Sequence, residues 1–105
     1  MSEPLPAPVV HDADHDRFVV NAGGTVAELV YRRDGGRLEL VHTGVPSALE
    51  GHGVGGRLVR AAVGWAAAEG WSVVPSCPFA RRWLREHPDV ASEVVIDWNR
   101  PERVR

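Results

Sequence analysis

The sequence of 105 residues lacks most features that mark specialised classes of protein. Its single cysteine cannot form an intramolecular disulfide, which argues against a disulfide-stapled secreted domain. It has no run of about eighteen apolar residues, the length that a membrane span needs. A formal net charge of -2 gives no strong basic surface for nucleic acid. The first eight residues have neither the basic start nor the apolar centre of a signal peptide. We therefore expect a cytoplasmic protein that binds neither membranes nor nucleic acid.

The composition is that of one soluble domain, with 44% hydrophobic and 25% charged residues. Three prolines in residues 1–8 predict a disordered tail. We expect a single domain over residues 9–99 and a frayed, charged C-terminus over 100–105. We expect no metal site and no second domain.

The first half of the chain has the signals of an antiparallel meander. We predict strands over residues 17–22, 25–33 and 37–43, because these segments are rich in Val, Leu and aromatic residues. Gly23-Gly24 and Asp34-Gly35-Gly36 separate them and are typical of tight turns. The third strand is predicted to be half-buried, because successive residues alternate between two faces. One face would carry Leu38, Leu40 and His42, and the other Glu39, Val41 and Thr43.

The second half changes its hydrophobic period. Apolar residues spaced by four predict a helix from about Val54 to Glu69, which Gly70 ends. A short β-branched segment over 71–76 predicts a buried strand. A second helix is expected over 78–86, ended by His87-Pro88. The fold class that follows is α/β (α+β), with a mixed, largely antiparallel sheet.

Four glycines in six residues, Gly51, Gly53, Gly55 and Gly56, join the third strand to the long helix. Free N–H groups at a helix N-terminus favour phosphate or pyrophosphate. The spacing also fits a dinucleotide fingerprint, but the preceding strands are predicted to be antiparallel and no acidic residue ends the next predicted strand. No Lys-Ser or Lys-Thr pair follows, as a P-loop requires. A plain turn between strand and helix remains the structural alternative.

Further residues extend the pattern beyond the glycines. They are His42-Thr43-x-Val45, Leu49-Glu50-Gly51-x-Gly53-x-Gly55-x-x-Leu58, Val74-Pro75-x-Cys77-Pro78-Phe79 and His87-Pro88. In this order and spacing, over about residues 16–90, the chain resembles a short single-domain subfamily of the GNAT N-acetyltransferase superfamily. Gly44 stands where members often carry Glu.

The resemblance implies acetyl-CoA as co-substrate and a glycine pyrophosphate loop leading into the long helix. The pyrophosphate would lie on the N–H groups of about residues 52–57, with a charge-assisted contact from Arg57. The pantetheine arm would follow the strand end over residues 42–45. The implied donor-binding residues are Thr43, Gly44, Val45, Glu50, Gly51, His52, Gly53, Val54, Gly55, Gly56, Arg57, Cys77 and Phe79.

The main candidates for catalysis are three residues, Cys77, His42 and Glu39. Cys77 precedes Pro78 at a helix start, where a thiolate is favoured, and could take up the acetyl group. The alternative is a small buried residue beside the cofactor, as free cysteine often is. His42 and Glu39, with Glu28 as a further possibility, are candidate general bases. Many GNAT enzymes use a late tyrosine as acid, but the only tyrosine here is Tyr31, early in the chain.

The function that we expect is transfer of an acetyl group from acetyl-CoA to an unknown amine, on a small molecule or a protein. A non-enzymatic acyl-CoA-binding or regulatory module is the alternative, favoured by the small size and the missing late tyrosine. A nucleotide-binding module is a third possibility. A monomer and a homodimer are both compatible with the sequence.

Overall fold

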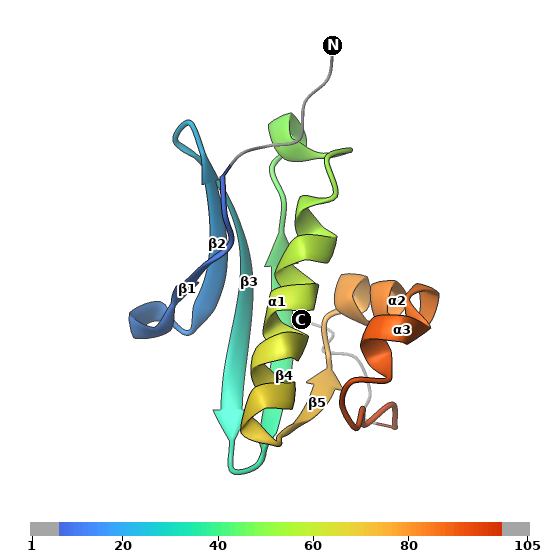
Figure 1. Ribbon diagram of the computed structural model, residues 1–105. Coiled ribbons are helices and arrows are strands. Elements are labelled where there is room, and N and C mark those ends of the chain that lie inside the picture. The colour runs from blue at the N-terminus through green and yellow to red at the C-terminus, as the bar shows by residue number, and fades with distance from the viewer. Residues whose placement is uncertain (1–6, 100–105) are drawn as a thin grey trace.

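A computed structural model describes residues 7–99, in which a sheet of five strands carries a long helix on one face (Figure 1). The strands follow one another across the sheet in chain order, and only β4 and β5 are parallel. They are β1 Val10–Asp12, β2 Arg17–Ala22, β3 Thr25–Asp34, β4 Arg37–Gly44 and β5 Ser72–Pro75. The predicted mixed, largely antiparallel α/β fold is confirmed. Residues 1–6 of the predicted tail and the whole predicted frayed end, 100–105, lie outside the described residues.

Three α-helices and two short 3-10 helices complete the described part of the chain. The α-helices are α1 Val54–Glu69, α2 Pro78–Glu86 and α3 Pro88–Ala91, and the 3-10 helices are η1 Ala13–His15 and η2 Ser47–Leu49. α1 ends where the sequence predicts, because Gly70 adopts a φ of 78° and its N–H bonds to the carbonyls of Ala66 and Ala67. None of the helices in the described part of the chain is long and apolar enough to cross a membrane.

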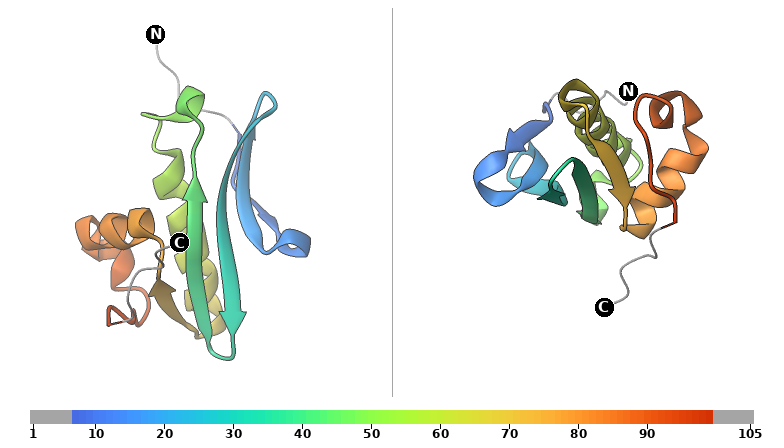
Figure 2. Two further views of the ribbon diagram at one scale, coloured as in Figure 1. Left: turned by 180° about the vertical axis from the view of Figure 1, so that it is seen from behind. Right: turned by 90° about the horizontal axis from the view of Figure 1, so that it is seen from below.

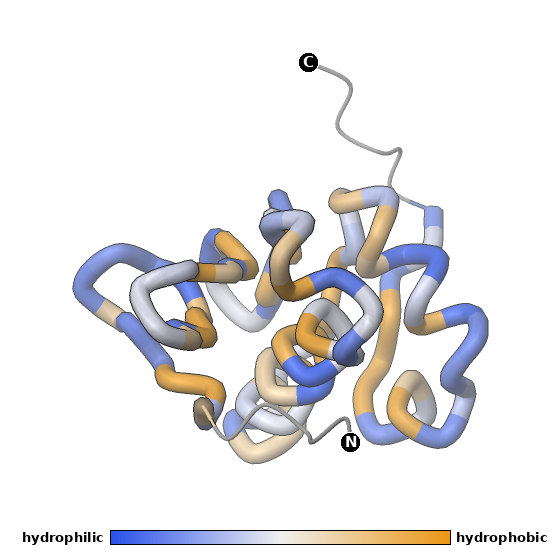
Figure 3. The backbone as a smooth tube through the Cα atoms, turned by 90° about the horizontal axis from the view of Figure 1, so that it is seen from above, coloured by the Kyte–Doolittle hydropathy of each residue, from blue (hydrophilic) through white to orange (hydrophobic). Residues whose placement is uncertain are grey.

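The core lies between α1 and the sheet. The buried side of α1 is mostly small or β-branched, with Leu58, Val59, Ala62, Val63 and Ala66 fully buried. It covers fully buried leucines of the central strands, and each such leucine stabilises the fold by about 1.5–3 kcal/mol through burial. Figure 3 shows hydrophobic and hydrophilic residues on different sides of the α1 coil, as expected of a helix covered on one side.

A β-bulge in β4 overturns one expectation. Tyr31 pairs with Leu40, but the preceding Val30 pairs with His42, so Val41 is an extra residue. The bulge reverses the alternation of side chains beyond it. Leu40 is fully buried toward α1, whereas His42 is exposed and lies on the opposite face with Val30. The prediction that His42 shares a face with Leu38 and Leu40 is therefore wrong.

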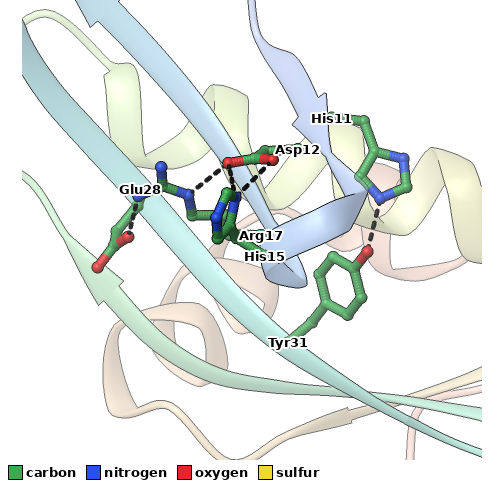
Figure 4. A network of polar contacts seen from close by, with 6 residues as sticks. All are labelled: His11, Asp12, His15, Arg17, Glu28 and Tyr31. Atoms are coloured by element: carbon green, nitrogen blue, oxygen red, sulfur yellow. Dashed lines mark hydrogen bonds and ion pairs between the residues drawn. The ribbon is translucent and has the colours of Figure 1, made fainter.

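The edge strand β1 is held by an aromatic cluster. The His11 ring stacks on Phe18 with centroids 4.3 Å apart and meets Trp65 edge-on at 4.4 Å. His11 Nε2 also lies 2.6 Å from the Tyr31 hydroxyl (Figure 4). Burial raises the pKa of Tyr31 above its usual value of 10.0. Side-chain contacts of His11 thus hold β1 in the sheet, since a strand of three residues forms few backbone hydrogen bonds.

A polar network flanks this cluster on the same strands (Figure 4). Asp12 Oδ2 lies 3.0 Å from His15 Nδ1 and accepts a hydrogen bond from Arg17 Nε at 2.8 Å. The His15 contact, followed by that of Arg17, holds the pKa of Asp12 below its usual 3.8. Arg17 Nη1 donates to Glu28 Oε1 at 2.9 Å, which links η1 and β2 to β3.

Candidate functional site

β4 extends beyond its parallel partner and leaves one edge open. β5 pairs only with residues 37–40 of β4, and the N–H of Cys77 adds one bond to the Leu40 carbonyl at 2.9 Å. The chain then turns away into α2 (Figure 1). Within residues 7–99, the rest of β4, residues 41–44, has no strand on that side. β4 and β5 therefore splay apart beyond Leu40, beside the strand end over residues 42–45.

A groove of about 490 Å³ occupies the space beside this open edge. The end of β4, the connection through η2, the first turn of α1 and one side of α2 form its walls. Its lining residues are Thr43, Val45, Leu49, Glu50, Gly51, Gly53, Val54, Gly55, Gly56, Phe79 and Trp83.

The first turn of α1 presents unpaired backbone donors to the groove. The first helical hydrogen bond runs from the N–H of Arg57 to the Gly53 carbonyl at 3.1 Å. The N–H groups of Val54, Gly55 and Gly56 precede it and have no acceptor within the helix. Gly53 is the N-cap and has no side chain to bind them, and the first turn has no acidic residue. These donors, with the positive end of the helix dipole, favour an anionic ligand.

The glycines of this segment have two different roles. Gly53 has a φ of 72°, which disfavours a side chain, and a Cβ placed there would meet no atom within 4 Å. A Cβ at Gly55 would instead lie 2.6 Å from Phe79 Cζ, and one at Gly56 would lie 2.5 Å from Trp83 Nε1. Gly51 and Gly53 thus shape an open loop, whereas Gly55 and Gly56 allow α2 to approach α1. The packing of α2 on α1 is thus a structural reason for this second pair, independent of any ligand.

Most of the residues predicted to bind the donor line the groove, and four do not. Gly44 lines a different hollow, His52 is exposed, and Cys77 is buried behind Thr43. Arg57 Nη2 donates to the Ala7 carbonyl at 2.7 Å, and Arg57 does not line the groove. Its contact with phosphate stays a prediction.

Two lining residues were not among those predicted to bind the donor. Leu49 is buried beneath the loop. Trp83 lies one turn after Phe79 on α2, and its i, i+4 spacing from Phe79 was the available signal. Its ring stacks on His87 with centroids 3.8 Å apart.

The candidate catalytic residues lie around the bulge in β4. Cys77 is the N-cap of α2, is 4% exposed, and places Sγ 3.3 Å from Thr43 Oγ1. Ser76, the preceding residue, donates from Oγ to Glu39 Oε2 at 2.6 Å. The His42 side chain is exposed and makes no hydrogen bond or ion pair within residues 7–99. Of the three, Cys77 is joined through Thr43 to the wall of the groove.

The described residues contain no group of three or more His, Cys, Asp or Glu side chains placed to hold a metal ion.

Comparison with known proteins identifies the family. Residues 17–94 match the model of the GCN5-related N-acetyl-transferase family. The chain belongs to this family. Among curated proteins, Protein NATD1 of Gallus gallus is 30% identical over 91 residues, which covers 84% of this chain and 83% of NATD1. Human NATD1 is also 30% identical over 91 residues, covering 84% and 80% of the two chains.

A solved structure agrees with the family assignment. A GCN5-like protein of Staphylococcus aureus, determined in solution by NMR, superposes with a TM-score of 0.65 at 28% identity. The match covers 80% of this chain and 85% of the other. The fold of this family member is therefore shared with a relative of similar extent.

Proposed function

We propose that the groove binds acetyl-CoA and that the chain transfers the acetyl group to an amine. The observation that carries the proposal is that one groove brings together two sets of backbone groups without partners in a helix or sheet. One set lies in the first turn of α1 and the other along the edge of β4. The free N–H groups of Val54, Gly55 and Gly56 suit a pyrophosphate. The open edge of β4 beyond Leu40 suits the amides of a pantetheine arm. An acyl-CoA in this position would direct its thioester toward Thr43 and Cys77.

Direct transfer requires a neutral amine and a route for one proton. The amine nitrogen attacks the thioester carbonyl carbon, the C–S bond breaks, and the sulfur leaves with the bonding electrons. The proton that the nitrogen loses passes to a base and then to the CoA thiolate. His42 and Glu39 are the candidate bases. His42 is exposed without a competing hydrogen bond, while Glu39 already accepts one from Ser76.

Cys77 offers a second route in two steps. Its sulfur attacks the thioester carbonyl carbon, the C–S bond to CoA breaks, and CoA leaves with the proton of the Cys77 thiol. The amine then attacks the acetyl carbon on Cys77, the C–Sγ bond breaks, and the proton lost by the nitrogen restores the thiol. The sequence allows a clean test because it contains no lysine, so no lysine side chain can be acetylated. We expect acetyl-CoA to add one acetyl group by intact mass, and Cys77→Ala to lose it while Cys77→Ser retains donor binding. An adduct that survives in Cys77→Ala would lie elsewhere and would refute this route.

The binding of acetyl-CoA is tested by calorimetric titration with acetyl-CoA, CoA, NAD and ATP. Gly53→Val adds a branched side chain at the N-cap, where it obstructs the approach of phosphate to the backbone. Gly35→Val is the matched control, since Gly35 has a φ of 62°, also has open space, and lies in the β3–β4 turn away from the groove. Both variants should lose similar stability, but only Gly53→Val should lose acetyl-CoA binding.

The alternatives give different results in the same experiment. Tight binding of NAD or ATP without CoA would favour a nucleotide-binding module. Binding of acetyl-CoA without transfer to any amine would favour an acyl-CoA-binding or regulatory module. Binding with transfer to an amine supports the acetyltransferase. Three segments of the subfamily pattern, those containing Thr43, Gly53 and Phe79, meet at the groove. This supports the resemblance of the chain to the short single-domain subfamily.

A further inference from the structure

The face of the sheet opposite α1 has a hollow of its own. Figure 2 shows this face, with no helix of the described chain lying over β2, β3 and β4. The hollow measures about 480 Å³ and is lined by Arg17, Val26, Glu28, Gly44, Val45 and Pro46. Val45 also lines the groove in which we propose that acetyl-CoA binds, so the hollow and the groove meet at the end of β4. A ligand in the hollow would lie next to the donor and on the other side of β4.

Two carboxylates share the one guanidinium of the hollow: Glu28 lines it with Arg17, and Asp12 binds Arg17 from outside the lining. The charge of Arg17 is therefore already satisfied, and an anionic ligand would compete with both acids. Only Oε1 of Glu28 takes the hydrogen bond from Arg17, and Oε2 has no such partner among residues 7–99 (Figure 4). Glu28 can thus receive a cation.

The bottom of the hollow is open because Gly44 has no side chain. Gly44 pairs directly with Glu28 across β3 and β4. A Cβ on Gly44 would lie 3.2 Å from His42 Nε2. The imidazole of His42 therefore lies beside Gly44, close to where a side chain at position 44 would begin. A carboxylate, an exposed imidazole and a bare stretch of backbone therefore lie together beside the splayed strand end. The remaining walls, Val26, Val45 and Pro46, are apolar and suit a hydrocarbon stem.

We propose that this hollow binds the acceptor, and that the acceptor is an aliphatic diamine. The inference rests on the acetyltransferase function proposed above. Glu28 favours a protonated ammonium group, whereas attack on a thioester requires a neutral amine, and one nitrogen cannot be both at once. A diamine meets both conditions: one ammonium lies on Glu28, the stem lies on Val26, Val45 and Pro46, and the second amine reaches around Val45 to the donor. Glu28 acts here as a binding residue, not as the base.

The binding step is tested by NMR on the 15N-labelled protein. The probes are 1,4-diaminobutane, 1-aminobutane and butyrate. Both amines should shift the amide signals of Val26 and Gly44, and butyrate should not. Glu28→Gln keeps the shape of the side chain and should abolish the shifts, whereas Glu69→Gln, at the exposed end of α1, should preserve them. Equal shifts with butyrate, or unchanged shifts in Glu28→Gln, would overturn the proposal.

The transfer step is tested with acetyl-CoA and the two amines. The diamine should have the lower KM, and Glu28→Gln should raise it about three- to tenfold with little change in kcat, as expected for a partly exposed charge pair. Gly44→Ala narrows the hollow without changing its charge and should raise KM in the same direction. Equal KM values for the diamine and 1-aminobutane would refute the diamine assignment.

Acetyl-CoA affinity is measured on each variant, so that failure of the two proposals can be told apart. Unchanged donor binding with unaffected amine kinetics in Glu28→Gln would refute the acceptor site alone. Absence of acetyl-CoA binding in the unaltered protein would refute the acetyltransferase itself, whatever the amines do at Glu28.

Discussion

Adding one methyl group to α1 should have opposite effects at two glycines. A Cβ at Gly56 would lie 2.5 Å, 2.9 Å and 3.1 Å from Nε1, Cε2 and Cζ2 of Trp83. Gly64 is exposed in the interior of the same helix, and a Cβ there would meet no atom within 4 Å. Neither glycine has a positive φ, so alanine fits the backbone at both positions. The two variants differ mainly in the contact with Trp83.

The expected magnitudes follow from two terms. Replacing a helical glycine with alanine raises the free energy of unfolding by about 0.8–1.0 kcal/mol. Overpacking at Gly56 costs about 1–3 kcal/mol, because the indole must move while stacked on His87. Gly64→Ala should therefore stabilise the protein by about 1 kcal/mol. Gly56→Ala should be less stable than Gly64→Ala by the whole overpacking term, about 1–3 kcal/mol.

Urea and thermal unfolding, followed by circular dichroism, measure both variants. Each kcal/mol corresponds to about 4–8 °C in Tm for a domain of this size. Trp83→Leu should shrink the penalty of Gly56→Ala, which a double-mutant cycle would detect as a coupling energy. If Gly56→Ala raises Tm as much as Gly64→Ala does, the absence of a side chain at Gly56 is not required for the approach of α2.

Three further changes test other parts of the structure. Asp12 has a lowered pKa in the folded state, so ionised Asp12 stabilises the fold above pH 3.8, and this stabilisation is lost as the pH falls through the pKa of the folded state. Asp12→Asn should therefore flatten the decline of Tm in this acid range. Tyr31 has a raised pKa, so its neutral form stabilises the fold below pH 10.0 and this contribution is lost as pH rises beyond it; Tyr31→Phe should remove that alkaline loss of Tm. If Arg57 contacts phosphate, Arg57→Ala should weaken acetyl-CoA binding and reduce its salt dependence, whereas unchanged titrations at low and high salt would leave Arg57 with its contact to Ala7 alone.

Elements with strong local signals could be predicted from the sequence. The spacing of Val54, Leu58 and Ala62 and the stop at Gly70 fix α1 to the residue, since both are properties of the helix itself. The turn at Gly35 separates β3 from β4 for the same reason. β1 gave no such signal, because three residues are too few to show a period and their anchorage comes from His11, which contacts distant aromatic residues.

The site could be predicted where its residues are contiguous, and less well where tertiary contacts decide. The segment from Glu50 to Gly56 contributes much of the lining of the groove. The face of His42 was mispredicted because the alternating pattern continues unbroken through the bulge at Val41, which only the pairing with β3 reveals. The contact between Gly56 and Trp83 depends on how α2 docks, and no local pattern encodes it.

The parallel pairing of β4 with β5 also bears on the order of assembly. β1 to β4 pair with their neighbours in the chain, so these contacts are short-range and can form early. β5 reaches β4 only after the intervening chain has crossed the sheet as α1, and α2 follows directly. The wall made by Phe79 and Trp83 thus follows directly on the strand whose pairing is long-range. A ligand of the groove selects the completely assembled chain, and it stabilises that state in proportion to the logarithm of its concentration once it exceeds its Kd.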